Sequence, residues 1–186
     1  MAEKVARYVE LRQVNATGAA GERARLDLAE AAFDLSLVAA SRRALDFRSQ
    51  DPAIEGARHR ALGNLAGAME DPETAIAEFE RAREYLPRDL YIEQHLVPLY
   101  LEVNRPADAR EAALRATELG PSNPLDFYNL ACAHARLNEI DAALAALSRA
   151  IDLGYHKAGK LLEDPDLVAL QDDPRFIKLA ERAAQD

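Results

Sequence analysis

The residues best suited to metal binding or nucleophilic catalysis are few in this chain, and their spacing forms no recognised motif. A metal site needs several ligands that converge, and a nucleophilic site needs a base beside its Ser or Cys. The single cysteine, Cys132, is expected to be an inert, small apolar residue. The four histidines fall on different predicted helices, without a Glu or Cys partner at ligand spacing: His59, His95, His134 and His156. The sequence therefore predicts no metal site.

Phosphate-binding chemistry is not indicated either. The 8 glycines are scattered, and neither a G-x-G-x-x-G nor a G-x-x-x-x-G-K-[ST] motif occurs. We therefore expect no nucleotide, no other cofactor and no catalytic activity. Because a catalytic triad is a spatial arrangement, an enzyme or small-ligand site is left open as an alternative, and it would need a closed pocket near Pro98 and Tyr128.

The composition is typical of a soluble helical protein with an acidic surface. Hydrophobic residues make up 49% of the 186 residues and charged residues 30%, with no Trp. The net charge of −9 arises in residues 51–186, which carry 15 basic and 25 acidic residues, whereas residues 1–50 carry 8 and 7. Such a surface repels phosphate backbones and anionic lipids, so neither nucleic acid nor a membrane is an expected partner. The lone cysteine and the lack of a visible signal peptide or apolar span predict a cytoplasmic protein.

Three segments of the chain share one pattern at intervals of 34 residues. In each copy a Leu is followed by a small or aliphatic residue and then by two alanines seven positions apart, and the first two copies close with Pro87 and Pro121. The aligned alanines are Ala75 and Ala82, Ala109 and Ala116, and Ala143 and Ala150. A unit of this length cannot bury its apolar face alone, so stacked neighbours must provide the stability.

Each copy is predicted to form two helices. Apolar residues recur every three or four positions, which indicates helices over 53–68, 72–85, 89–103, 106–119, 124–137 and 139–153. The helix starts carry a side-chain acceptor, often before a Pro: Asp51, Asp71, Asp89, and Ser122 or Asn123. Because the connections are short, consecutive helices must pack antiparallel, and small residues allow their close approach.

With its Leu-Gly pair, two spaced alanines, intervening Phe79 and closing Pro87, the segment 56–87 resembles the tetratricopeptide repeat. The resemblance extends over residues 56–155. It implies an all-α fold, a right-handed superhelical α-solenoid of antiparallel helix pairs, and a role in binding peptides or proteins. The second copy departs from the pattern with Pro98 inside its first helix, where the proline either frees carbonyl groups for a ligand or is a tolerated kink.

The resemblance also implies where a ligand would bind. In stacked tetratricopeptide hairpins the first helix of each pair lines a concave surface, and helical phase relative to Leu62, Leu96 and Leu130 selects its outward residues. Amide, guanidinium and phenol groups on that surface can contact a peptide. The selected residues are Arg60, Asn64, Tyr91, Gln94, His95, Tyr128, Asn129 and Arg136. The alternative is that any exposed helix face carries such residues.

A specialised form of this groove is not expected. Some family members clamp the terminal carboxylate of chaperone tails with two Lys, two Asn and one Arg. The matching positions here hold Arg60 and Asn64, followed by His95, Leu125 and Asn129. Because the third copy contributes no positive charge at these positions, a very acidic tail is not an expected ligand.

After the third copy a shorter duplication occurs, DPDLVAL at 164–170 and DPRFIKL at 173–179. Each Asp-Pro pair is expected to open a short helix, with apolar anchors at Leu167, Leu170, Phe176 and Leu179. The duplication resembles an extension found after tetratricopeptide arrays in bacterial proteins. We expect it to cap the exposed end of the array.

Residues 1–50 are predicted to form helices over 2–14 and 22–48, joined by a flexible linker. The second helix carries a broad apolar stripe that includes Leu26, Phe33 and Phe47. One interpretation is a degenerate fourth hairpin that caps the array. The other is a dimerisation or docking helix, because the stripe is wider than a lone surface helix needs.

The sequence thus predicts three parts: N-terminal helices over 1–50, three repeats over 51–155, and capping helices over 156–186. We expect a bacterial, cytoplasmic scaffold that holds a peptide or protein segment in a groove built by the first helices of residues 53–137. The alternative is an adaptor that self-associates as a homodimer through residues 22–48.

Overall fold

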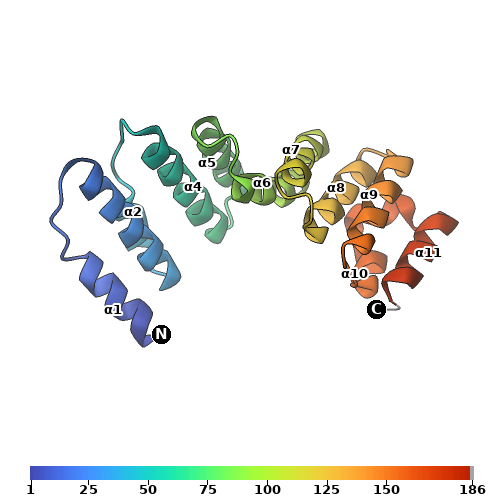
Figure 1. The fold of residues 1–186 in the computed structure, drawn as a ribbon, viewed down its shortest axis with the longest axis horizontal. Helices are drawn as coiled ribbons and strands as arrows, with labels where there is room; N and C mark the ends of the chain where they lie inside the picture. Colours follow the sequence, from blue (N-terminus) through green and yellow to red (C-terminus); the bar gives the residue numbers. More distant parts are fainter. Residues whose placement is uncertain (185–186) are drawn as a thin grey trace. The chain divides into compact units, whose positions relative to one another are not determined.

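Residues 1–184 are described by a computed structural model of the chain, and all regular structure in this range is helical, as the sequence predicts (Figure 1). Two compact units divide the chain, Met1–Ile92 and Glu93–Asp186. The first unit contains α1 (Ala2–Leu11), α2 (Gly18–Asp34), α3 (Val38–Ala44), α4 (Pro52–Ala68) and α5 (Pro72–Tyr85), and the unit boundary falls within α6 (Leu90–Glu102). The second unit continues with α7 (Pro106–Leu119), α8 (Pro124–Arg136), α9 (Ile140–Asp152), α10 (Ala158–Glu163), the 3-10 helix η1 (Pro165–Leu170) and α11 (Pro174–Ala183).

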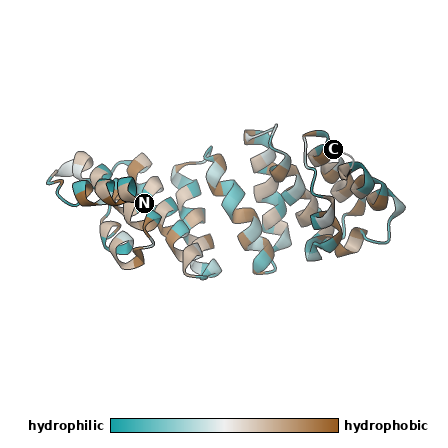
Figure 2. Ribbon diagram, turned by 90° about the horizontal axis from the view of Figure 1, so that it is seen from below, coloured by the Kyte–Doolittle hydropathy of each residue, from teal (hydrophilic) through white to brown (hydrophobic). Residues whose placement is uncertain are grey.

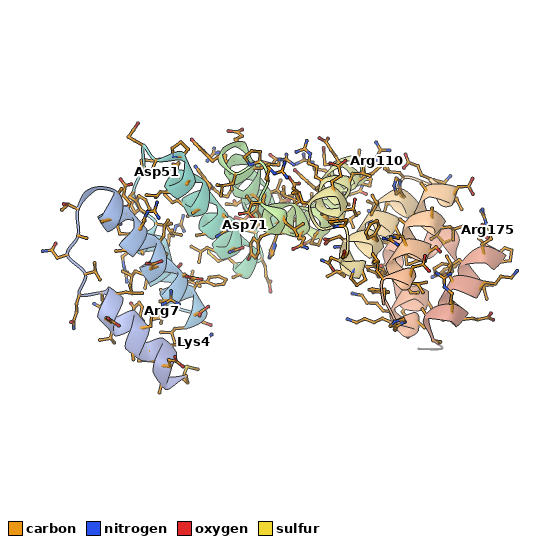
Figure 3. All side chains as sticks on the ribbon, in the orientation of Figure 1. Lys4, Arg7, Asp51, Asp71, Arg110 and Arg175 are labelled. Atoms are coloured by element: carbon orange, nitrogen blue, oxygen red, sulfur yellow. The ribbon has the colours of Figure 1, made fainter. Side chains whose placement is uncertain are left out.

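The six helices of the three predicted pairs, α4 to α9, lie where the sequence places them, and every predicted bound is met to within one residue. The side chains of Asp51 and Asp71, labelled in Figure 3, accept hydrogen bonds from backbone N–H groups in the first turns of α4 and α5. Of the two candidates before α8, Asn123 rather than Ser122 forms the cap. The caps therefore fix where these helices begin.

The repeated alanines lie inside the helix pairs, as expected. Ala75 and Ala82 on α5 are buried, and so are their counterparts Ala109, Ala116, Ala143 and Ala150. The same close approach explains Gly63 on α4, because a Cβ atom there would lie 3.0 Å from ring atoms of Phe79. Hydrophobic and hydrophilic residues are interleaved along the helices in Figure 2, as expected when each helix buries one side.

One backbone turn recurs at intervals of 34 residues. Its central residue is left-handed, with φ between 57° and 59°, at Ser36, Glu70, Asn104 and Asn138. In each turn the N–H of the next residue bonds to the carbonyl group five positions before it, for example from Asp71 to Ala66 at 3.1 Å. This is the Schellman arrangement that ends a helix. The turn joins α2 to α3 as it joins the three predicted pairs, so residues 18–44 share the local geometry of the repeats.

The predicted single helix over 22–48 is wrong, because the chain reverses at Ser36. Instead, α2 and α3 pack on each other around a buried cluster of Ala29, Ala44 and Leu45. Two apolar faces that meet in a hairpin appear in the sequence as one broad stripe. Since the width of that stripe is the reason for expecting a dimerisation helix, the homodimer stays a prediction without that support.

The C-terminal part contains the two expected Asp-Pro starts. Asp164 and Asp173 accept hydrogen bonds from backbone N–H groups of the following turns, and the anchors Leu167, Leu170 and Phe176 are fully buried. The first of these segments is a 3-10 helix, and α10 before it was not predicted from the sequence. No helix within residues 1–184 combines the length and the apolar character needed to cross a membrane.

The recurring turn leads to a stability prediction at Glu70. A side chain in the left-handed region costs about 1 kcal/mol, and glycine avoids that cost. We expect Glu70→Gly to stabilise the protein by about 0.5–1 kcal/mol in chemical denaturation. The matched control is Ala77→Gly at an exposed position inside α5, which is expected to destabilise by about 1 kcal/mol. A loss of stability for Glu70→Gly would show that this turn is not strained.

Candidate functional site

Three of the predicted binding residues come together in the first unit. Arg60 and Asn64 lie one turn apart on α4, and Tyr91 lies in the first turn of α6. The Tyr91 hydroxyl donates a hydrogen bond to Asn64 Oδ1 at 2.9 Å, and the Arg60 guanidinium lies 5.4 Å from the centre of the Tyr91 ring. Arg60 Nη1 also forms an ion pair of 2.6 Å with Asp89, which accepts a hydrogen bond from the Tyr91 N–H. We call these four residues the Arg60 cluster.

A cavity of about 260 Å³ lies beside the Arg60 cluster. Arg60 and Asn64 of α4 line it, together with the acidic Asp27 and Glu30 and the ring of Phe33 from α2. A ligand in this cavity would therefore meet one guanidinium, two carboxylates and an aromatic ring. Such a mixed surface suits hydrogen bonding to a peptide better than it suits a single strongly charged group.

A larger cavity, of about 440 Å³, lies in the second unit and contains three further predicted residues. We call it the Pro98 cavity. Its lining residues are Pro98, Leu101 and Glu102 of α6, Tyr128, Asn129, Cys132 and Arg136 of α8, and Lys160, Asp164 and Asp166 of the C-terminal part. Pro98, Glu102 and Lys160 are exposed, so the cavity opens to solvent. It is therefore not the closed pocket that the small-ligand alternative requires.

Tyr128 does not lie where helical phase places it, because its side chain is buried rather than directed to solvent. Its ring stacks on Tyr155 with the centroids 4.4 Å apart, and its hydroxyl donates a hydrogen bond to Asp164. Burial raises the pKa of the Tyr128 phenol above its ordinary value, so the group stays protonated and keeps donating. The phase argument considered only the repeats, whereas the C-terminal residues cover this side chain.

Arg136 is held at the edge of the Pro98 cavity by two hydrogen bonds. Its Nη1 donates to Asp166 at 2.5 Å and its Nη2 to Asn104 Oδ1 at 2.7 Å. The guanidinium is therefore fixed before any ligand arrives, which lowers the entropic cost of binding. Asn129, one helical turn from Cys132 on the same wall, is half-buried.

Gln94 and His95 contribute less to these surfaces. Gln94 Nε2 donates to both carboxylate oxygens of Asp126, at 3.0 and 3.1 Å. Asp126 is buried, and burial raises the pKa of its carboxyl group. The Gln94 amide therefore satisfies a buried polar group of the second unit. His95 is half-buried and lines neither the Pro98 cavity nor the cavity beside Arg60.

One group of side chains has the donor atoms of a cation site. Within residues 1–184, Cys132 Sγ and carboxylate oxygens of Asp164 and Asp166 lie within 4.8 Å of one another. Asp164 and Asp166 already accept hydrogen bonds, from the Tyr128 hydroxyl and the Arg136 guanidinium. Burial raises the pKa of the Cys132 thiol and so disfavours the thiolate that a metal would need. The nearby Arg136 guanidinium would also repel a cation. The group is a hydrogen-bonded wall of the Pro98 cavity.

A buried charged network on α4 was missed by the sequence reasoning. Arg58 donates to both oxygens of Glu55, at 3.0 and 2.6 Å, and His59 Nδ1 lies 2.5 Å from a Glu78 oxygen. The Arg58 hydrogen bonds, with help from the Ser49 N–H, lower the pKa of Glu55 from 4.5 to about 2. The expectation that no histidine has a Glu at ligand spacing is wrong, because Glu55 is four residues before His59 and 3.4 Å from it. These contacts satisfy charges inside the first unit.

The sequence reasoning also missed three charged residues of the C-terminal part that line the Pro98 cavity, Lys160, Asp164 and Asp166. Asp164 is recognisable in the sequence as a helix cap, and it does accept from the Asp166 N–H. Its second contact, with the Tyr128 hydroxyl, joins residues 36 positions apart, which no local pattern reveals. Lys160, whose Nζ lies 5.5 Å from the centre of the Tyr128 ring, belongs to the helix that the sequence did not predict.

No protein-family model matches the chain. A segment of 55 residues is 36% identical to a chloroplastic protein of Arabidopsis thaliana. The match covers 30% of this chain and only 16% of that protein, so the chain spans a small fraction of its relative.

Several solved structures share the arrangement of helices at low sequence identity. YrrB, described as a tetratricopeptide protein with an unusual peptide-binding site, has a TM-score of 0.69 at 15% identity over 86% of this chain and 83% of its own. BtubC from P. vanneervenii has a TM-score of 0.69 at 15% identity over 98% and 87% of the two chains, and MamA 41-end from Desulfovibrio magneticus has 0.68 at 14% over 92% and 100%. The chain therefore has an all-helical, tetratricopeptide-like fold of paired helices.

Proposed function

We propose that this chain is a scaffold that binds a peptide or protein segment with the first helices of its pairs, α4, α6 and α8, and that it has no catalytic role of its own. The observation that supports this most is the Pro98 cavity, where Asn129 and Arg136 of α8 stand beside Pro98 and Leu101 of α6 in a space that opens to solvent. YrrB, which shares the fold, is described as having a peptide-binding site.

The chemistry of the Pro98 cavity suits a peptide. The Asn129 amide can both donate to and accept from a peptide backbone, and Pro98 and Leu101 offer apolar area for a side chain. The cations Arg136 and Lys160 can bind a carbonyl or carboxylate group of the ligand. Because the walls carry both charge signs, specificity would come from the positions of these groups rather than from net charge.

The organisation of the chain is part of the proposal. We propose that residues 18–44 are a fourth helix pair preceding the three repeats of 51–155, since they use the same turn at Ser36. Residues 156–186 would cap the array, which the burial of Leu167 and Phe176 supports. We also propose a cytoplasmic location, for which the lone cysteine and the lack of a visible signal peptide are the support.

The test uses peptides selected from a random library for binding to the wild-type chain. We expect Asn129→Ala combined with Arg136→Ala to weaken the affinity of the selected peptides by about tenfold or more, because two polar anchors are lost. Arg60→Ala combined with Asn64→Ala tests the Arg60 cluster in the same way. Fluorescence anisotropy gives the affinities, and circular dichroism checks that helicity is intact.

The control is Lys178→Ala, which removes an exposed cation of α11 that does not line the Pro98 cavity. Its affinity for the selected peptides is expected to equal that of the wild type. If both double variants bind as tightly as this control, the ligand does not use the first helices and the proposed function is wrong.

A further inference from the structure

The side chains that line a third cavity are positively charged, whereas the chain as a whole is acidic. It has a volume of about 330 Å³ and lies among α1, α2 and α3 of the first unit. Its lining residues are Tyr8, Arg12, Arg25, Leu28, Ala40, Arg43 and Ala44. Three arginines and no acidic residue line a cavity in a chain with 32 acidic and 23 basic residues. We call it the arginine cavity.

The elements around the arginine cavity are fixed by ion pairs and by packing. Lys4 and Arg7 of α1, labelled in Figure 3, pair with Asp34 and Glu30 of α2 at 3.3 and 3.4 Å. These exposed pairs join α1 to α2, while the Ser36 turn and the buried cluster of Ala29, Ala44 and Leu45 hold α3 on α2. Arg25 and Arg43 therefore come from the packed helices α2 and α3, and Arg12 is the residue that ends α1.

The arginines of this cavity differ from most others in their partners. Elsewhere guanidinium groups pair with carboxylates, as Arg58 does with Glu55 and Arg110 with Glu139. Within residues 1–184, Arg12, Arg25 and Arg43 form no ion pair with a carboxylate, although Arg12 lies over the Tyr8 ring at 5.8 Å. An anion in the cavity would therefore not have to displace a paired carboxylate from these three guanidinium groups.

Arg25 is held in place at one side of the cavity. Its Nε donates to the Ala44 carbonyl at 3.0 Å, its Nη2 donates to the Arg43 and Asp46 carbonyls, and its guanidinium lies 4.8 Å from the centre of the Phe47 ring. These bonds use Nε and Nη2, so the Nη1 donors have no hydrogen bond within residues 1–184. Because the fold already orients the Arg25 guanidinium, this side chain loses less conformational entropy when a ligand binds.

From this geometry we propose that the arginine cavity binds a phosphate monoester group. Guanidinium groups match the acceptor oxygens of such an anion with paired hydrogen bonds, and the Tyr8 hydroxyl adds a further donor. A phosphate monoester carries a charge of about −2 at neutral pH and three strong acceptor oxygens, so it uses several arginines where a single carboxylate uses one. The volume is at the lower end of the range for ligand sites and fits one such group with its nearest atoms.

The group could come from a phosphorylated side chain of a protein or from free phosphate, and the experiment separates these sources. The first probe is a short peptide with one phosphoserine and no other charged side chain, the second is the same peptide without phosphate, and the third is inorganic phosphate. We expect the wild-type chain to bind the phosphopeptide and not its unphosphorylated form. Tighter binding of the phosphopeptide assigns the cavity to a protein ligand, and equal binding of inorganic phosphate assigns it to the free anion.

The variants use two neighbouring arginines of α3. Arg42 and Arg43 are both exposed, and only Arg43 lines the arginine cavity. We expect Arg43→Gln to weaken phosphopeptide binding by about tenfold or more, because a charge-assisted hydrogen bond is lost, and Arg42→Gln to leave it within about twofold. Both variants remove one positive charge, so the comparison cancels any general electrostatic effect.

Two results would overturn the proposal. Equal losses for Arg42→Gln and Arg43→Gln would mean that the anion is attracted by the surface charge of α3 and not bound in the cavity. The lack of any binding of the phosphopeptide and of inorganic phosphate to the wild-type chain would mean that no phosphate site exists. Neither result depends on the Pro98 cavity, so the proposed function is tested separately.

Discussion

Replacing Ala82 with Arg is expected to unfold the first unit. Ala82 lies on α5 with no exposed surface, at a position where the helices of a pair approach closely. An arginine there must either force the helices apart or bury an unpaired charge, and each costs several kcal/mol. We expect a loss of about 4 kcal/mol or more in the free energy of unfolding, which approaches the total stability of a small domain. Circular dichroism in a denaturant titration measures it.

The matched control is Ala77→Arg on the same helix, where the alanine is exposed. It adds the same side chain and charge without disturbing the interface, so we expect a change within about 0.5 kcal/mol. Similar losses for both variants would contradict the idea that close packing at the repeated alanines holds the pairs together.

The second large effect is expected at Glu55, whose carboxylate is buried against Arg58. Glu55→Gln leaves the buried guanidinium without its counter-charge, and breaking a buried pair in this way costs about 3 kcal/mol or more. Asp108→Asn is the control, because Asp108 forms an exposed pair with Arg105 at the same three-residue spacing and 2.7 Å. The control is expected to cost less than about 1 kcal/mol. A loss as small as that of the control would show that the buried pair adds little to stability.

The lowered pKa of Glu55 also predicts how the stability of the wild-type chain depends on pH. The pKa of Glu55 is about 2 in the folded chain against an ordinary 4.5, so the folded state favours the charged form. The stabilisation is complete above pH 4.5 and is lost as the pH falls from 4.5 towards 2, by about 3 kcal/mol in total. Glu55→Gln should lack this part of the acid sensitivity. An unchanged slope in the variant would assign the acid sensitivity to other carboxyl groups.

The helices of the three repeats could be predicted closely because two independent signals agree there. The apolar spacing gives the extent of each helix, and capping residues such as Asp71 and Asn123 give its start. The turn at Ser36 was missed because serine is not a typical left-handed residue, whereas Asn104 and Asn138 are. The helix pair it joins therefore looked like one long helix.

Ser41, a small residue of α3, could have revealed that the N-terminal helix pair follows the 34-residue spacing of the repeats. Ser41 lies 34 residues before Ala75 and is buried like it. Its hydroxyl donates to the Ala29 carbonyl at 2.9 Å, so it can replace an alanine in the interior at little cost. A search for alanine alone does not find this position, whereas a search for any small side chain that can satisfy its own polar group does.

The candidate site was predictable to the extent that it rests on the repeats. Arg60 and Asn64 are neighbours on one helix face, as helical phase requires, and Tyr91, which was also selected from the sequence, forms a hydrogen bond with Asn64. The burial of Tyr128 could not be predicted, because it depends on Asp164 and on a helix for which the sequence gave no clear start. Residues that act through contacts between distant segments are not marked by any local spacing.

The turn that recurs at Ser36, Glu70, Asn104 and Asn138 has a consequence for the order in which the chain assembles. Each turn closes a pair of helices that are adjacent in sequence, so most native contacts form between residues that are close together in the sequence. Chains with such local contacts cross a low entropic barrier and fold within microseconds to milliseconds. Assembly can begin at a helix pair and spread to the helices packed beside it within the same unit. We expect α1 to open first, because none of its residues is buried.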